Sequence, residues 1–263
     1  MMPMRAADGK SLAVVITGGT RGIGAGIAAA FLRAGNRVLV CGRNAPADAA
    51  MLPSADGQTA VYCQADVRDP AQAAEVIRTA HAAFGRVDVV ISNAGGSPEA
   101  AAATASPRYH QKIIELILIA PLHVAQSANE VMQAQEGGGT IIMIGSVSGA
   151  RPSPGTAAYG AAKAGLHHLV TSLAIEWAPQ VRVTCVAPGF VETETPGSHY
   201  GDAAGEAAVR RTVPLQRMAT PQDVADACLF LASPQAAYIS GATLLLHGGG
   251  EPPAFLAAVR GTA

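Results

Sequence analysis

The chain has 263 residues, of which 49% are hydrophobic, 14% charged and 4% aromatic, and its formal net charge is −1. This length allows one domain with a sizeable core, and the near-neutral charge argues against a broad basic surface for nucleic acid. The longest apolar helix-like stretch, 113–128, contains Glu115 and Pro121 and is too short and too polar for a membrane span. We expect neither a nucleic-acid partner nor a membrane partner.

Four cysteines, Cys41, Cys63, Cys185 and Cys228, are far apart and form no Cys-x-x-Cys motif. We interpret them as reduced structural residues, which predicts a cytoplasmic protein. No His/Cys cluster has the spacing of metal ligands, so we expect no metal site. Residues 1–11 read as a polar tail without the apolar run of a signal peptide.

Strands and helices alternate along the chain. We predict strands at 12–16, 37–41, 59–65, 87–92, 140–144, 181–187 and 243–246. We predict helices at 22–34, 70–84, 107–135 and 221–232. A further predicted helix carries Tyr159 and ends near Trp177. This alternation predicts an α/β fold: a single-domain, Rossmann-type, doubly wound parallel sheet of about seven strands with helices on both faces. The domain spans 12–250 and is followed by a tail at 251–263. The stretch 44–58 reads as a loop or a short helix.

The segment 190–213 interrupts this alternation with Gly, Pro, Ser and Thr residues. Long irregular insertions in compact domains often act as lids or binding loops. We predict a substrate loop or lid here, with a plain surface loop as the alternative. His199 and Tyr200 in this segment are candidates for substrate contact.

A glycine-rich loop, Thr17-Gly-Gly-Thr-Arg-Gly-Ile-Gly24, joins the first predicted strand to the first predicted helix. Glycines let the backbone approach a ligand closely, and a helix N-terminus offers N–H groups and partial positive charge to a pyrophosphate. The loop therefore predicts a dinucleotide site. The expected contacts are Gly18, Thr20, Arg21, Gly22, Ile23 and Gly24.

The second predicted strand ends in Gly42-Arg43-Asn44 and lacks the carboxylate that usually accepts from the ribose 2′-hydroxyl of NAD. Arg43, with Arg21 as a second charge, favours the 2′-phosphate of NADP, although NAD remains possible. The alternative is that both are solvated surface arginines.

Two further strand ends carry candidate cofactor residues. Asp66, followed by Val67, either accepts from the adenine amino group or serves as a turn residue. Asn93, Ala94 and Gly95 follow the fourth predicted strand, where small residues allow close approach of the cofactor.

Ser146, Tyr159 and Lys163 form a candidate catalytic set. Residues four apart lie on the same face of a helix, which places the Lys163 ammonium near the Tyr159 phenol. A phenol ordinarily has a pKa of ~10, and a nearby positive charge lowers it toward the range useful for general acid–base catalysis. Ser146, thirteen residues before Tyr159, is placed to hydrogen bond the substrate oxygen.

Together these motifs resemble the short-chain dehydrogenase/reductase family of the classical type, over about 12–249. Pro188-Gly189 followed by Thr193, and a final strand ending in Gly248-Gly249, add to the resemblance. Similarity is closest to the branch of 3-oxoacyl-carrier-protein reductases.

The resemblance implies hydride transfer between nicotinamide and a carbonyl or secondary alcohol carbon. By resemblance Tyr159 is the acid/base, Lys163 binds the nicotinamide ribose, and Ser146 orients the substrate. Pro188, Gly189, Val191 and Thr193 would line the nicotinamide. The family is commonly oligomeric, so a homotetramer or homodimer is expected, and the other partner is a small-molecule substrate.

One residue departs from the family pattern. Many members carry an Asn, which holds a water of the proton relay, where this chain has Ile117. The alternative function is therefore a cofactor-binding relative with weak or no catalysis. His167 and His168 follow Lys163 on the same predicted helix and are expected to serve surface or interface packing.

Overall fold

The computed structural model describes residues 11–96, 98–193, 202–253, 255–256 and 259. Seven parallel strands form one sheet in the order β5-β2-β1-β6-β7-β8-β9. Their bounds are β1 Ala13–Thr17, β2 Arg37–Gly42, β5 Val61–Gln64, β6 Val89–Ser92, β7 Gly139–Ile144, β8 Val181–Pro188 and β9 Thr243–Leu246. The predicted doubly wound parallel sheet is confirmed.

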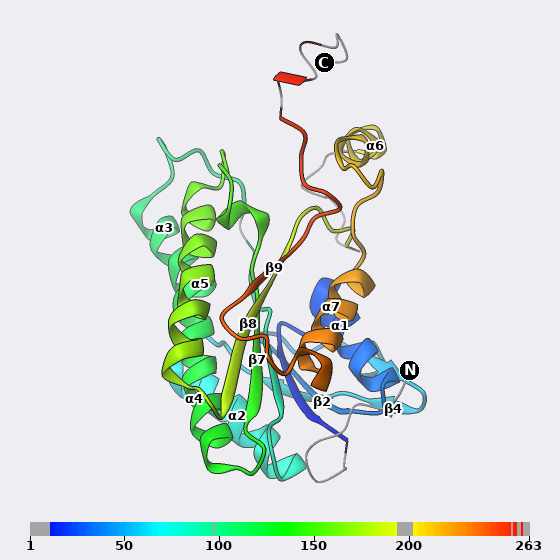
Figure 1. The fold of residues 1–263 in the computed structure, drawn as a ribbon, viewed down its shortest axis with the longest axis vertical. Coiled ribbons are helices and arrows are strands. Elements are labelled where there is room, and N and C mark those ends of the chain that lie inside the picture. Colours follow the sequence, from blue (N-terminus) through cyan, green and yellow to red (C-terminus); the bar gives the residue numbers. More distant parts are fainter. Residues whose placement is uncertain (1–10, 97, 194–201, 254, 257–258, 260–263) are drawn as a thin grey trace.

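Helices cover both faces of this sheet (Figure 1). Helices α1 (Gly22–Arg33) and α7 (Pro221–Ala232) lie on one face, and α2 (Pro70–Phe84), α4 (Ala120–Ala134) and α5 (Ala157–Glu176) lie on the other. Successive strand residues point to opposite faces. Val14 and Ile16 of β1 therefore join the α1/α7 core, whereas Val15 joins the α2/α4/α5 core.

The strand order reverses direction between β1 and β6. The chain leaves β1 through α1 to pair β2 on one side, and it later returns to pair β6 on the other side of β1. In open α/β sheets ligands bind beyond the carboxyl ends of the strands at such a reversal. The fold thus places the predicted site at the ends of β1 and β6.

The predicted helix at 107–135 is interrupted. Helix α3 (Pro107–Ile114) is followed by a π-helical segment, η2 (Glu115–Ile119), and then by α4. A π-helical segment inserts extra backbone into a helix and is found frequently at functional sites. This interruption coincides with the position of Ile117.

The region before β5 is also more structured than expected. A short 3-10 turn, η1 (Ala49–Met51), precedes a two-stranded antiparallel hairpin of β3 (Ser54–Ala55) and β4 (Gln58–Thr59), and the third strand of the main sheet is shorter than predicted. Asp56 and Gly57, both at positive φ, form the turn that separates the two hairpin strands.

The predicted lid contains a helix, α6 (Ala203–Thr212), whose N-terminus is capped by Asp202. It lies beyond the end of the sheet near the C-terminal segment (Figure 1). His199 and Tyr200 lie outside the described residues. The four cysteines are free thiols, as predicted, and no helix in the described ranges is long and apolar enough to cross a membrane.

Candidate active site

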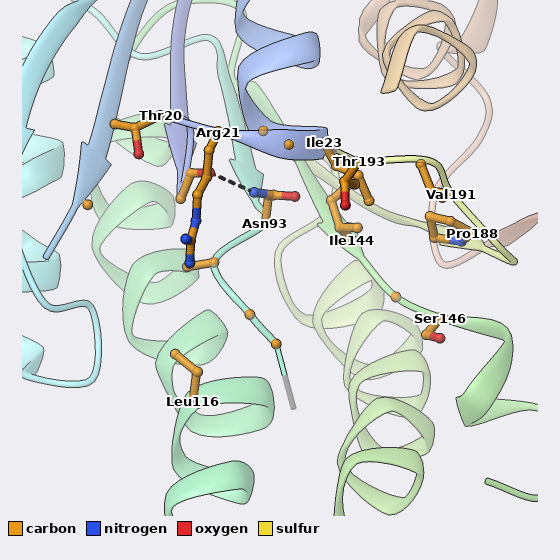
Figure 2. A pocket seen from close by; sticks show the side chains of 18 of the residues that line it. Thr20, Arg21, Ile23, Asn93, Leu116, Ile144, Ser146, Pro188, Val191 and Thr193 are labelled. Atoms are coloured by element: carbon orange, nitrogen blue, oxygen red, sulfur yellow. Dashed lines mark hydrogen bonds between the residues drawn. The ribbon is translucent and has the colours of Figure 1, made fainter. Parts of the chain in front are cut away.

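A cavity of about 860 Å³ lies at the carboxyl ends of the strands. It is lined by the loops that follow β1, β2, β5, β6, β7 and β8, together with residues of α5 and α6 (Figure 2). The structure brings the predicted catalytic and cofactor-binding residues to this cavity: Gly18, Thr20, Arg21, Gly22, Ile23, Gly24, Arg43, Asp66, Val67, Asn93, Ala94, Gly95, Ser146, Tyr159, Lys163, Pro188, Gly189, Val191 and Thr193.

Other lining residues were not predicted. Several of them are sequence neighbours of predicted residues. They could have been predicted by assuming that every residue at the end of a strand lines the site. Leu116 reaches the cavity from the π-helical segment (Figure 2), whereas two residues come from α6, far along the chain. The added residues include Gly42, Asn44, Gly96, Leu116, Ile144, Gly145, Glu192, Glu206, Arg210 and Met218.

The N-terminus of α1 suits an anionic ligand. No side chain caps it, whereas Asp69 caps α2 and Thr220 caps α7. Gly24 is packed so tightly that a Cβ there would lie 2.2 Å from the Gly18 carbonyl oxygen. Glycine therefore brings the loop and the helix together, and the N–H groups of the first turn, which no side chain caps, suit the pyrophosphate of a dinucleotide.

Asn93 lines the cavity, and its side chain holds the glycine-rich loop. Its side-chain amide donates to the carbonyl oxygens of Thr17 and Gly18, at 3.1 Å each. The Thr17 hydroxyl accepts in return from the backbone of Asn93 and Ala94, at 3.0 Å each. These bonds join the ends of β1 and β6 and set the shape of the glycine-rich loop.

The end of β2 presents Arg43 to the cavity without a carboxylate partner among the residues that follow the strand. Asp66, the nearby carboxylate, forms an ion pair with Arg68, with Nε of Arg68 2.9 Å from Oδ1. The hydrogen bond from Arg68 lowers the pKa of Asp66 below its ordinary value. Asp66 also accepts from the backbone N–H of Arg68, which supports the turn role that was one of its two predicted roles.

Tyr159 and Lys163 lie on α5, and Ser146 is the second residue after β7. Lys163 is buried, its Nζ donates to the Ile144 carbonyl oxygen at 2.5 Å, and it lies 5.6 Å from the centroid of the Tyr159 ring. Burial lowers the pKa of Lys163 from 10.5 to about 8. The Ser146 Oγ accepts from the Ser148 backbone N–H at 3.1 Å, so its own proton is left to donate.

Ile117 is buried in a small apolar cluster with Ile113 and Ala162. A Cβ on Gly95 would lie 3.3 Å from its Cδ1, so the side chain supports the loop after β6. The position where the family resemblance predicts an Asn is thus part of the packing between the π-helical segment and α5.

We expect Ile117→Asn to destabilise the protein. An amide placed among Ile113 and Ala162 without a hydrogen-bond partner costs about 1–3 kcal/mol, and the lost aliphatic packing adds to this. Thermal unfolding, compared with that of Ile117→Val, measures the effect. An Ile117→Asn protein that unfolds at the same temperature as Ile117→Val would contradict this expectation. A raised turnover of the folded variant would show, separately, that the missing amide limits proton transfer.

An ion pair joins α6 to the segment after β8. Arg210 Nε lies 3.0 Å from Glu192 Oε1, and its Nη2 lies 3.6 Å from Glu206 Oε2. All three residues line the cavity. Helix α6 is therefore held beside the cavity mouth by charged side chains.

The parallel sheet and the glycine-rich loop at the carboxyl end of β1 make this a Rossmann-type fold. The family described as enoyl-(acyl carrier protein) reductase matches residues 18–251. The chain belongs to the short-chain dehydrogenase/reductase family of NAD(P)-dependent oxidoreductases.

The relatives have diverse names. The chain is 34% identical over 241 residues to a 3-oxoacyl-[acyl-carrier-protein] reductase of Chlamydia muridarum, covering 90% of this chain and 96% of that protein. It is 33% identical over 250 residues to an L-rhamnose 1-dehydrogenase (NAD(P)(+)) of a Sphingomonas species, covering 94% and 98%. A short-chain type dehydrogenase/reductase structure from Mycobacterium ulcerans superimposes with a TM-score of 0.84 at 27% identity, covering 91% and 90%.

Proposed function

We propose that this protein transfers a hydride between C4 of the nicotinamide of NADP(H) and the carbon of a ketone or secondary alcohol, with Tyr159 as the general acid and base. One observation carries the proposal. The glycine-rich loop lines the same cavity as Ser146, Tyr159 and the buried Lys163.

A bound nicotinamide dinucleotide would supply or accept the hydride, and the side chains of the protein manage the proton. In reduction Tyr159 protonates the substrate oxygen as it gains charge, and in oxidation it removes that proton. Ser146 donates to the same oxygen, since its Oγ already accepts from Ser148. The ammonium of Lys163 favours the phenolate form of Tyr159, and its remaining protons suit the ribose hydroxyls.

The charge at the end of β2 supports NADP. Arg43 lines the cavity and is exposed, and Arg21 in the glycine-rich loop lines the same cavity. Arg forms strong, bidentate hydrogen bonds with phosphate. The only carboxylate next to Arg43 in the cavity lining, among the described residues, is Asp66, which Arg68 occupies.

Arg43→Ala is expected to weaken NADPH binding about 10- to 100-fold and to leave NADH binding within about twofold. The reason is the loss of a charged hydrogen bond to the 2′-phosphate, which NADH lacks. Fluorescence titration of both cofactors measures this, with Arg78→Ala, an exposed arginine of α2, as the matched control. Equal weakening of NADPH and NADH would contradict the role of Arg43.

The second candidate is a cofactor-binding protein with little catalysis, and the aliphatic Ile117 favours it. Incubation of the wild type with NADPH and a panel of ketones, including acyl thioesters, steroids and sugars, separates the two. Oxidation of NADPH that depends on one of these ketones supports the enzyme. Tight NADPH binding without turnover on any of them supports the binding protein.

A further inference from the structure

His167 lies one helical turn beyond Lys163 on α5, on the side that faces Ser146. It was expected at the surface or an interface, but its ring is half-buried, and the backbone N–H of Ser146 donates to its Nε2 at 3.5 Å. A ring nitrogen accepts only when it carries no proton. The structure therefore pairs the Ser146 backbone with a neutral imidazole whose proton is on Nδ1.

Two glycines close the Ser146 turn onto this ring. A Cβ on Gly145 would lie 2.5 Å from Nε2 of His167, and a Cβ on Gly149 would lie 2.8 Å from Cε1. Both ends of the turn 145–149 thus approach the imidazole more closely than any other residue type permits. The turn 145–149 packs against the imidazole ring of His167 at both of its ends.

We infer that His167 is a positioning residue, which accepts the Ser146 N–H and holds the Ser146 hydroxyl where it meets the substrate oxygen. This inference rests on the proposed function, in which Ser146 donates to that oxygen. His167 itself touches neither substrate nor cofactor, and it acts through the turn 145–149.

The surroundings keep the imidazole neutral. The titratable groups that face it are Lys163 on α5 and the Cys185 thiol on β8, which Gly145 separates from the ring; β7 and the turn 147–149 contain none. Burial, and then the charge of Lys163, lower the pKa of His167 below its ordinary value of 6.5. Protonation at acidic pH removes the acceptor for Ser146 and adds a second cation beside Lys163.

The first test compares His167→Leu with His167→Gln, whose amide oxygen replaces the acceptor but does not titrate. We expect kcat of His167→Leu to fall about five- to tenfold, with KM little changed, since one hydrogen bond that orients Ser146 is lost. His167→Gln should keep kcat within about twofold of wild type and should lose activity less steeply at acidic pH. His168→Leu and His168→Gln, at the exposed neighbour, are the controls.

The inference is overturned if folded His167→Leu has the kcat and pH profile of the wild type. It is also overturned if His167→Gln is as slow as His167→Leu, because then the acceptor is not what matters. Thermal unfolding of each variant identifies any loss that comes from misfolding.

A second readout does not depend on turnover. In the wild type the amide proton resonance of Ser146 should shift with pH as His167 titrates, and in His167→Gln that shift should be absent. The inference is overturned, even in an active enzyme, if the amide proton resonance of Ser146 has the same pH dependence in the wild type and in His167→Gln. Failure of the proposed function shows itself differently, as a wild type that turns over none of the ketones.

Discussion

Replacing Tyr159 by phenylalanine is expected to lower turnover by about 10²–10⁴-fold, the usual contribution of a positioned acid–base group. The variant lacks only the hydroxyl, so the packing of the ring and the Lys163 position beneath it are kept. Cofactor binding should remain close to that of the wild type. Steady-state rates on an accepted ketone and fluorescence titration of NADPH measure the two effects separately.

Tyr238→Phe is the matched control, because Tyr238 is fully exposed and lies outside the cavity. It should leave both measurements unchanged. If Tyr159→Phe kept more than about a tenth of the wild-type rate, another group would have to supply the proton.

Lys163→Met is expected to lower turnover by about 10²-fold or more, because it removes the charge that favours the phenolate and a donor for the ribose. Its effect on stability should be small. The variant leaves the Ile144 carbonyl oxygen without this donor, which costs about 1–3 kcal/mol, but it also removes a charge buried in the protein. Lys112→Met, at an exposed position of α3, is the control for both rate and thermal unfolding.

The same lysine predicts a pH dependence of stability. The unfolded chain holds the Lys163 proton up to a pKa of 10.5, whereas the folded chain releases it at about 8. Between these values the unfolded state binds more protons, so this lysine makes the free energy of unfolding rise with pH. The buried thiols of Cys41, Cys185 and Cys228, whose pKa values are raised above 9.0, oppose this rise at higher pH. The test is therefore the difference between two proteins: in urea unfolding across this range, the free energy of unfolding of the wild type should rise relative to that of Lys163→Met. If the free energy of unfolding had the same pH dependence in the wild type and in Lys163→Met, Lys163 would not be buried in its charged form.

The sheet and the cofactor end of the site could be predicted because short-range chemistry determines them. Aliphatic runs such as those of β1 and β7 have few alternatives to a buried parallel strand, and the glycines around Arg21 serve only a loop that approaches a ligand. Tyr159 and Lys163 lie on one helix, so their spacing alone places them together.

The parts that sequence could not predict depend on contacts between distant segments. The π-helical segment around Ile117 has a sequence that is equally compatible with an ordinary α-helix, and in the structure Ile117 shares a buried cluster with Ala162 of α5. Arg210 and Glu206 reach the cavity only because the chain folds α6 back over it. No local pattern predicts that return.

His167 is an intermediate case. Its i+4 spacing from Lys163 places it on the catalytic face of α5, and that spacing was available from the sequence. What the sequence did not provide was the turn 145–149, whose two glycines close over the ring. The functional meaning of the histidine comes from this pairing and not from its own neighbours in the chain.

Transfer of deuterium from the cofactor to the product shows whether this protein moves a hydride from nicotinamide to a carbonyl carbon. NADPH carrying deuterium at the transferred position of C4 is incubated with the wild type and an accepted ketone, and the alcohol product is analysed by mass spectrometry and NMR. A direct hydride transfer at this site predicts one deuterium on the carbinol carbon of the product, formed far more slowly by Tyr159→Phe. A product without deuterium at that carbon would rule out direct hydride transfer from NADPH, and one formed equally fast by Tyr159→Phe would rule out Tyr159 as the acid.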